Sequence, residues 1–303
     1  MHGCGRAGGK VILLGEHVVV YGRPAIAAGL PIGLEVEVSV GAGPAVTSDD
    51  ALLAADTRPQ MLLVQAAQLV GIDPTRVVAR VRSDLPAGRG LGSSAALSVA
   101  MLRAMASAAG HRLDTPAELD AGRRLEAVFH GTPSGIDPAA AALGTCFRFV
   151  RGEPPSVTPV HPVAPLPLVI AFGDRPRSTG AAVGGLRARW EAARARYESL
   201  FDEVAAVVQR GAAAAASGDL ATLGRAFDDN QTLLERLGVS SDEIAALVEA
   251  ARRAGALGAK LTGGGAGGAV IALAQDPEML ASRLRRDGWT TLVARIGGQG
   301  SVA

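Results

Sequence analysis

The chain has few aromatic residues, few cysteines and no excess of charge of either sign. Aromatic residues make up 3% of its 303 residues, so alanine, valine and leucine must supply most of the core, and stacking platforms for nucleic-acid bases are not expected. A formal net charge of +1 gives no reason to expect a nucleic acid or a membrane surface as a partner. The two cysteines, Cys4 and Cys146, lie far apart in the sequence. They form neither a disulfide framework nor a metal-ligand spacing, and they suit a reducing compartment.

Long apolar runs and a targeting signal are also missing. The longest apolar stretches, such as Ala269 to Ala274, are too short to span a bilayer, and no charged segment followed by an apolar one opens the chain. We therefore expect a soluble, cytoplasmic protein. Hydrophobic residues make up 48% and charged residues 19%, which indicates a globular chain with one large or two medium domains.

Hydrophobic periodicity predicts a chain that opens with an antiparallel β region and continues with mixed helices and strands. Strands are expected at residues 10–14, 18–21, 25–30, 34–40, 77–81, 168–172, 269–274 and 290–296. Helices are expected at residues 60–70, 94–109, 115–129, 186–216 (with room for one break), 220–237, 240–254 and 276–286, and a short one after residue 138. The proline-rich stretch from Pro154 to Pro167 is typical of a connector, which predicts domains at 1–160 and 161–303.

One glycine-rich stretch runs from Pro86 to Ala96 and leads directly into a predicted helix. Glycines at 88, 90 and 92 allow turns that a Cβ atom would forbid. The unpaired N–H groups of the helix start can hold a phosphate, and Ser93 or Ser94 would cap the helix or reach a metal ion. The common P-loop pattern G-x-x-x-x-G-K-[ST] is absent. The alternative is an ordinary glycine-rich turn with serine N-caps.

A second glycine-rich stretch runs from Lys260 to Gly268. Its G-x-G-x-x-G spacing precedes a strand, whereas a dinucleotide fingerprint opens a helix. The H-R-D and D-F-G motifs of protein kinases are absent. What remains is a loop with exposed N–H groups and room for a ligand or another loop. A flexible hairpin is the alternative.

Charged residues gather in two further places. Lys10 opens an apolar strand whose far end carries Glu16 and His17; the alternative is a strand end and a polar turn. Glu126 and Asp137 flank a loop, and near phosphates one carboxylate would hold Mg²⁺ and the other would lie by an acceptor hydroxyl. A surface glutamate and a helix N-cap are the alternatives there.

In their order along the chain, these four stretches resemble the GHMP kinases, and within them the members that phosphorylate mevalonate. The motif Pro-x-x-x-Gly-Leu-Gly-Ser-Ser-Ala-Ala, found here at 86–96, is specific for the superfamily. Residues 9–22, Gly-Lys-Val-Ile-Leu-Leu-Gly-Glu-His-Val-Val-Val-Tyr-Gly, resemble the mevalonate-specific form. Leu97 stands where members often carry a tyrosine, and Gly264 and Ala266 stand where alanine and glycine are usual.

The resemblance implies an α+β fold of two domains with the active site in the cleft between them. The N-terminal domain would resemble domain 2 of ribosomal protein S5, and the C-terminal domain would be ferredoxin-like. The implied reaction is the ATP- and Mg²⁺-dependent phosphorylation of the primary 5-hydroxyl of (R)-mevalonate, which gives 5-phosphomevalonate and ADP in the mevalonate pathway of isoprenoid biosynthesis.

The resemblance also implies a role for each matching position. Asp137 would be the catalytic base, Lys10 would pair with it, and Ser94 and Glu126 would bind Mg²⁺. The acceptor would contact Lys10, Glu16, His17, Asp137, Thr179, Gly264 and Gly265. The ATP phosphates would be wrapped by Pro86, Gly88, Gly90, Leu91, Gly92, Ser93, Ser94 and Ala95.

Two other functions remain open from the sequence. One is another GHMP small-molecule kinase, acting on phosphomevalonate or a sugar; the other is a ligand-binding relative without catalysis. The co-occurrence of Lys10, Ser94, Glu126 and Asp137 argues against the second. Expected partners are mevalonate and ATP. A homodimer is left open, since the arginine-rich helix from Leu186 fits either an interface or a solvated face.

Overall fold

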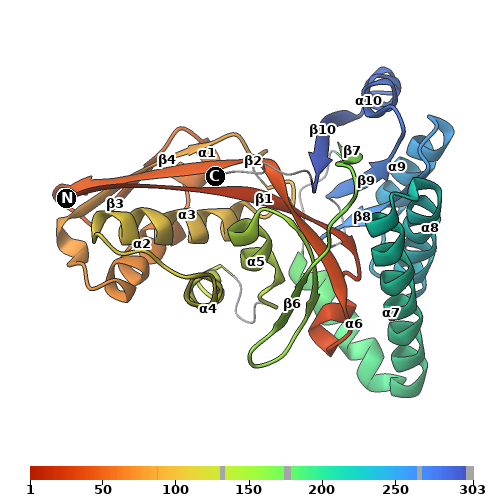
Figure 1. Ribbon diagram of the computed structural model, residues 1–303, viewed down its shortest axis with the longest axis horizontal. Helices are drawn as coiled ribbons and strands as arrows, with labels where there is room; N and C mark the ends of the chain where they lie inside the picture. Colours follow the sequence, from red (N-terminus) through yellow and green to blue (C-terminus); the bar gives the residue numbers. More distant parts are fainter. Residues whose placement is uncertain (87, 130–133, 174–178, 265–267, 298–303) are drawn as a thin grey trace.

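The computed structural model describes residues 1–86, 88–129, 134–173, 179–264 and 268–297, and of residues 179–183 the backbone only. Two β-sheets organise it, each covered by its own helices (Figure 1). The first sheet and its helices occupy the left of the view, and the second sheet and the long helices occupy the right.

The first sheet is built around two long antiparallel strands. The central one, β2, pairs with β1 along one edge; on its other edge the first half pairs with β5 and the second half with β4. The predicted antiparallel opening of the chain is thus confirmed. The strands of this sheet are β1 (His2–Leu14), β2 (Ala25–Val40), β3 (Ala45–Ser48), β4 (Val77–Ser83), β5 (Cys146–Val150) and β6 (Ser156–Pro159).

Small residues bring the central helix of this half, α3, close to β1. A Cβ atom on Gly5 would lie 2.2 Å from the carbonyl oxygen of Ala100, so the backbones touch where side chains would normally separate them. Close packing of alanine and glycine thereby fills core space in a chain with few aromatic residues. The helices here are η1 (Val18–Tyr21, 3₁₀), α1 (Ala51–Ala54), α2 (Arg58–Leu69), η2 (Pro74–Arg76, 3₁₀), α3 (Ser93–Ala108), α4 (Thr115–Glu126) and α5 (Ile136–Leu143).

The second sheet is antiparallel throughout, in the order β10-β7-β9-β8. Its strands are β7 (Leu166–Phe172), β8 (Gly258–Thr262), β9 (Ala269–Leu273) and β10 (Thr290–Ile296). Its helices are α6 (Thr179–Ala192), α7 (Arg194–Ser217), α8 (Leu220–Arg236), α9 (Asp242–Arg253) and α10 (Pro277–Arg286). The break expected within residues 186–216 falls between α6 and α7.

The two halves meet where β1 ends. Tyr21, which follows β1, stacks on Phe201 of α7 with ring centroids 4.6 Å apart. Leu14 packs into α7 at Gly211, where a Cβ atom would lie 2.1 Å from the Leu14 Cδ1 atom. The end of β1 is therefore shared by both halves.

Several local expectations were wrong. Residues 18–21 form the 3₁₀ helix η1 and not a strand, because Gly15 (φ 91°) and His17 (φ 63°) turn the chain and Gly22 (φ 80°) closes the turn. Residues 25–40 form one strand, and residues 260–262 extend β8 instead of belonging to a loop.

The sequence patterns Thr115-Pro116-Ala117-Glu118 and Ser240-Ser241-Asp242-Glu243 predict capping boxes with Thr115 and Ser240 as N-caps, and both true caps lie one residue away. Asp114, not Thr115, caps α4 by accepting from the Ala117 N–H, and Ser241 caps α9. The strands β3, β5 and β6 were not expected. In the part of the chain that the structure describes, no helix combines the length and apolarity needed to cross a membrane.

Candidate active site

The predicted site residues lie along the edge of β1 that faces away from β2. At Lys10 the backbone N–H of this edge donates to the carbonyl oxygen of Leu91 in the first glycine-rich loop, at 2.7 Å. Two residues on, the Ile12 N–H donates to the Thr262 Oγ1 atom of β8, at 2.9 Å. One edge of one strand thus holds the loop from the first half and a strand from the second.

The glycine-rich loop adopts the conformation that its sequence predicts. Gly88, Gly90 and Gly92 all have positive φ angles, of 69°, 80° and 78°. Gly92, and not a serine, occupies the N-cap position of α3, and no side chain caps the helix there. Ser93 and Ser94 therefore lie in the first turn, whose N–H groups have no partners within the helix. The expectation that a serine caps the helix was wrong. Because Gly92 offers no side-chain oxygen to the first-turn N–H groups, the start of the helix is better suited to bind an anion.

Beside this helix start lies an ion pair between residues far apart in the sequence. Lys10 Nζ and Asp137 Oδ2 are 3.0 Å apart, with the lysine side chain 4% and the aspartate side chain 28% exposed. Gly92 is needed for this arrangement, since a Cβ atom there would lie 2.5 Å from the Lys10 Cγ atom. Asp137 lies in the first turn of α5 and is not its N-cap, which is Gly135.

Glu126 is the third charged residue of this group. It lies at the end of α4 and is buried, with 2% of its surface exposed. Burial, together with the negative charge of Asp137, raises the pKa of Glu126 to about 8, and the charge of Lys10 opposes this rise. A carboxyl group in this state becomes an anion readily once a cation approaches it.

A cavity of about 160 Å³ opens at the Lys10–Asp137 pair. Of the seven residues expected to contact an acceptor, Lys10, Glu16, His17, Asp137 and Gly264 line it. Gly265 and the side chain of Thr179 lie outside the described residues. Sequence reasoning missed its apolar wall, which consists of Ile12, Val19, Val20, Tyr21, Ile136 and Leu186. The misread turn at 18–21 explains part of that omission.

A larger hollow, of about 920 Å³, lies between α4, α5 and the β5–β6 hairpin. It shares Ser134 with the smaller cavity but contains neither Lys10 nor Asp137. The smaller cavity is therefore the candidate active site, because the groups that can move a proton or hold a charge gather there.

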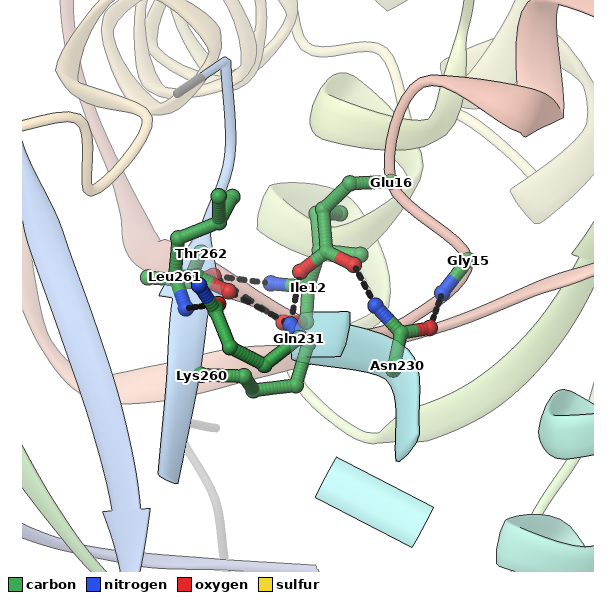
Figure 2. Close-up of polar contacts among 8 residues, drawn as sticks. All are labelled: Ile12, Gly15, Glu16, Asn230, Gln231, Lys260, Leu261 and Thr262. Carbon is green, nitrogen blue, oxygen red and sulfur yellow. Dashed lines mark hydrogen bonds and ion pairs between the residues drawn. The ribbon is translucent and has the colours of Figure 1, made fainter. Parts of the chain in front are cut away.

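A cluster of buried polar side chains surrounds Glu16, which lines the cavity; Figure 2 shows their contacts. Glu16 pairs with Lys260 of β8 and accepts a hydrogen bond from Asn230 of α8. Thr262 also returns a hydrogen bond to the Ile12 carbonyl, at 3.0 Å. Asn230 and Gln231 carried no signal in the sequence, and Lys260 was assigned to a glycine-rich loop, because nothing local marks a lysine in a strand or an amide in a helix as buried.

Two family models match this chain. The model described as GHMP kinases N terminal domain matches residues 61–145, which include the glycine-rich loop, Glu126 and Asp137. The model described as GHMP kinases C terminal matches residues 212–288, which include α8 and β8. Together with the relatives below, these matches show that the chain belongs to the GHMP kinase family and has its two-domain fold.

Within the family, the relatives point to one group. A protein named mevalonate kinase from Thermococcus onnurineus (strain NA1) is 31% identical over 96% of this chain and 95% of its own. The crystal structure of L. major mevalonate kinase in complex with R-mevalonate covers 99% of this chain and 96% of its own, at 27% identity and a TM-score of 0.84. The Streptococcus pneumoniae phosphomevalonate kinase, at 19% identity and a TM-score of 0.81, shares the fold. The resemblance seen in the motifs is confirmed: the chain groups with the mevalonate kinases.

Proposed function

We propose that the protein is an ATP-dependent kinase that phosphorylates the primary 5-hydroxyl of (R)-mevalonate and releases ADP. The observation that carries this proposal is the Lys10–Asp137 ion pair, which lies in a small cavity beside the start of α3. The start of α3 suits the ATP phosphates, and the cavity suits a small acceptor. The mevalonate kinases among the relatives supply the identity of the acceptor.

Phosphoryl transfer depends on alignment and charge neutralisation more than on covalent help from the protein. Asp137 accepts the proton of the attacking hydroxyl, and Lys10, which pairs with Asp137 at 3.0 Å, orients the carboxylate and polarises the hydroxyl. The backbone N–H groups at the start of α3 hold the phosphates, and Gly88, Gly90 and Gly92 let them approach the backbone.

Mg²⁺ is part of this proposal, with Ser94 and Glu126 as its protein ligands. Mg²⁺ prefers oxygen donors and is commonly held by one or two carboxylates while substrate phosphates supply other ligands. Among the described residues, no three His, Cys, Asp or Glu side chains cluster so that they could hold a metal by themselves. One hydroxyl and one carboxylate therefore fit an ion that arrives with ATP, and such an ion would neutralise phosphate charge.

The experiment that tests the function is an ADP-release assay with purified protein and four acceptors: mevalonate, phosphomevalonate, galactose and homoserine. We expect turnover with mevalonate and at least about tenfold lower kcat/KM with the others. Among the described residues that line the cavity, Lys10 is the one lysine or arginine, and a phosphorylated acceptor would call for more. Preferred turnover of phosphomevalonate or galactose would contradict the proposal.

We also propose a domain boundary near residue 160, between β6 of the first sheet and β7 of the second. Two free cysteines, one buried and one exposed, are consistent with the cytoplasmic location expected from the sequence. The exposed arginines Arg187 and Arg194 pair with glutamates on their own helical segments, which supports a solvated face over a dimer interface. Light scattering tests the alternative of a homodimer.

A further inference from the structure

Behind the cavity wall, a fully buried ion pair joins the two halves of the molecule. Glu16 follows β1 and lines the cavity, whereas Lys260 lies on β8 and does not line it. Figure 2 shows the two side chains next to each other. Lys260 is 0% and Glu16 2% exposed. Charges removed from water in this way persist only when both find further hydrogen bonds, because the loss of hydration is otherwise uncompensated.

The surroundings of Lys260 identify it as an ammonium ion. Its Nζ atom contacts three oxygens: Glu16 Oε1, the Leu261 carbonyl at 2.5 Å and the Ile12 carbonyl at 3.5 Å. Three acceptors call for three N–H donors, which an ammonium has and a neutral amine lacks. Burial lowers the pKa of Lys260, and the attraction of Glu16 opposes that shift.

The surroundings of Glu16 identify it as a carboxylate. The Asn230 Oδ1 atom accepts from the Gly15 N–H at 3.2 Å, which fixes the orientation of the amide. The Asn230 Nδ2 atom therefore donates to Glu16 Oε2, at 3.3 Å. With Lys260 on Oε1, both oxygens of Glu16 accept hydrogen bonds. Burial raises the pKa of Glu16, and Lys260 opposes that rise, so the charge on Glu16 depends on Lys260.

The strand that carries Lys260 is fixed on both sides. The Leu261 N–H donates to Gln231 Oε1 at 2.9 Å, and Thr262 Oγ1 both accepts from and donates to the Ile12 backbone. Gly263 and Gly264, which follow, line the cavity. Lys260 thus stands on a rigid support directly behind one wall of the site.

We propose that Lys260 is a positioning residue for the acceptor: without touching it, Lys260 holds the Glu16 carboxylate charged and in one orientation at the cavity wall. Asn230 assists from the other carboxylate oxygen. The inference rests on the proposed function, since it concerns the acceptor side of the same cavity, and it adds a residue outside the cavity to the machinery that recognises the acceptor.

A double-mutant cycle on kcat/KM tests the proposal with wild type, Glu16→Gln, Lys260→Met and the double variant. Methionine keeps the unbranched shape of lysine without its charge. In the wild-type background, Lys260→Met should lower kcat/KM for mevalonate about tenfold or more, mainly through KM, with KM for ATP little changed. In the Glu16→Gln background, Lys260→Met should lower kcat/KM by less than about twofold, because the side chain at position 16, on which Lys260 acts, is already neutral.

Arg23→Met is the matched control. Arg23 also links the two halves, through ion pairs of 2.7 Å to Glu198 and 2.9 Å to Asp202, but it does not line the cavity and is partly exposed. We expect its kcat/KM to stay within about twofold of wild type, since exposed pairs contribute little. An equal loss in Arg23→Met and Lys260→Met would overturn the positioning role in favour of general bracing between the halves.

The single variant Lys260→Met leaves a buried carboxylate without its cation and could fail to fold. The comparison of Glu16→Gln with the double variant still decides the matter, because the double variant contains no charge at this pair and in Glu16→Gln the Lys260 ammonium keeps two backbone carbonyl acceptors. A further tenfold loss of kcat/KM in the double variant would show that Lys260 acts independently of Glu16.

If wild type itself does not phosphorylate mevalonate, the proposed function fails. The same four proteins, unfolded in urea, then measure the Glu16–Lys260 coupling without any acceptor, and the absence of coupling would refute the pair itself.

Discussion

At the scale of single residues, Asp137 carries the most specific prediction. Replacement by asparagine keeps its size but removes the base, so we expect kcat to fall by about 10² or more, the usual contribution of a general base. The measurement is ADP release at saturating ATP and mevalonate. Asp120→Asn on the exposed face of α4 is the control, since among the described residues Asp120 forms ion pairs only with Arg123 and Arg124 of its own helix. Near wild-type turnover in Asp137→Asn would remove the assignment of the base.

The raised pKa of Glu126 predicts how the requirement for magnesium depends on pH. Its pKa of about 8 in the protein without metal means that a proton must leave before a cation binds. The ionised fraction rises about ninefold from pH 6 to pH 7 and about fivefold from pH 7 to pH 8, so the Mg²⁺ concentration for half-maximal activity should fall as pH rises. Measuring that concentration across the pH range checks the prediction.

The matched variant for this measurement is Glu126→Gln. It should bind Mg²⁺ weakly at every pH and lose the pH dependence, because glutamine has no proton to release. The same linkage predicts that the metal-free protein loses stability as pH rises from about 4.5 towards 8, since the unfolded carboxyl ionises first. An unchanged metal requirement between pH 6 and pH 8 in wild type would contradict the assignment.

At the scale of elements, the contact between β1 and α3 sets where the phosphate-binding end of the helix lies. Gly5→Ala would place a methyl group 2.2 Å from the Ala100 carbonyl oxygen, a clash that only a backbone shift can relieve. We expect a loss of about 1–3 kcal/mol in the free energy of unfolding, the usual cost of overpacking, measured in urea. A shift of α3 should also raise KM for ATP.

Gly184→Ala provides the comparison for that variant. Gly184 lies in helix α6, and a Cβ atom there would meet nothing within 4 Å. Alanine should leave stability unchanged or raise it by up to about 1 kcal/mol, since glycine is the poorer helix former. Equal losses in the two variants would mean that close approach at Gly5 is not the cause.

At the scale of the whole molecule, Arg89 ties the phosphate loop of the first half to the second sheet. Its guanidinium donates to the Gly173 carbonyl and lies 5.8 Å from the centroid of the Phe172 ring, at the end of β7. Removing both contacts in Arg89→Ala should loosen the loop and raise KM for ATP about five- to tenfold, with KM for mevalonate little changed.

Arg58→Ala is the control for this contact between the halves. Arg58 also lies over a ring, 5.2 Å from the Phe129 centroid, but in the described part of the chain its polar side-chain partner is Asp56, which belongs to neither the loop nor the second sheet. Its kinetic constants should match those of wild type. If Arg89→Ala binds ATP as wild type does, the loop is held by its own backbone bond from Lys10 to Leu91 and needs no support from β7.

Features that depend on neighbouring residues could be predicted from the sequence, whereas features that depend on tertiary packing could not. Cap residues such as Asp276, the break between α6 and α7, and the positive φ angles of the loop glycines were predictable, because each depends on a few neighbouring residues. Residues 18–21 were misassigned because their β-branched side chains favour a strand, whereas burial of Val18 and Val19 below a tight turn decides the outcome.

The sequence by itself determined the family and the chemical groups of the site, since the glycines, serines, lysine and carboxylates stand in short motifs of fixed order. The tertiary structure alone decided which groups meet: Lys10 with Asp137 at 3.0 Å, and Glu16 with a lysine 244 residues away. It also decided the pKa of Glu126, which depends on burial and on a charge from another element. Local patterns encode the propensities of the backbone, whereas ion pairs and desolvation exist only once distant segments have packed together.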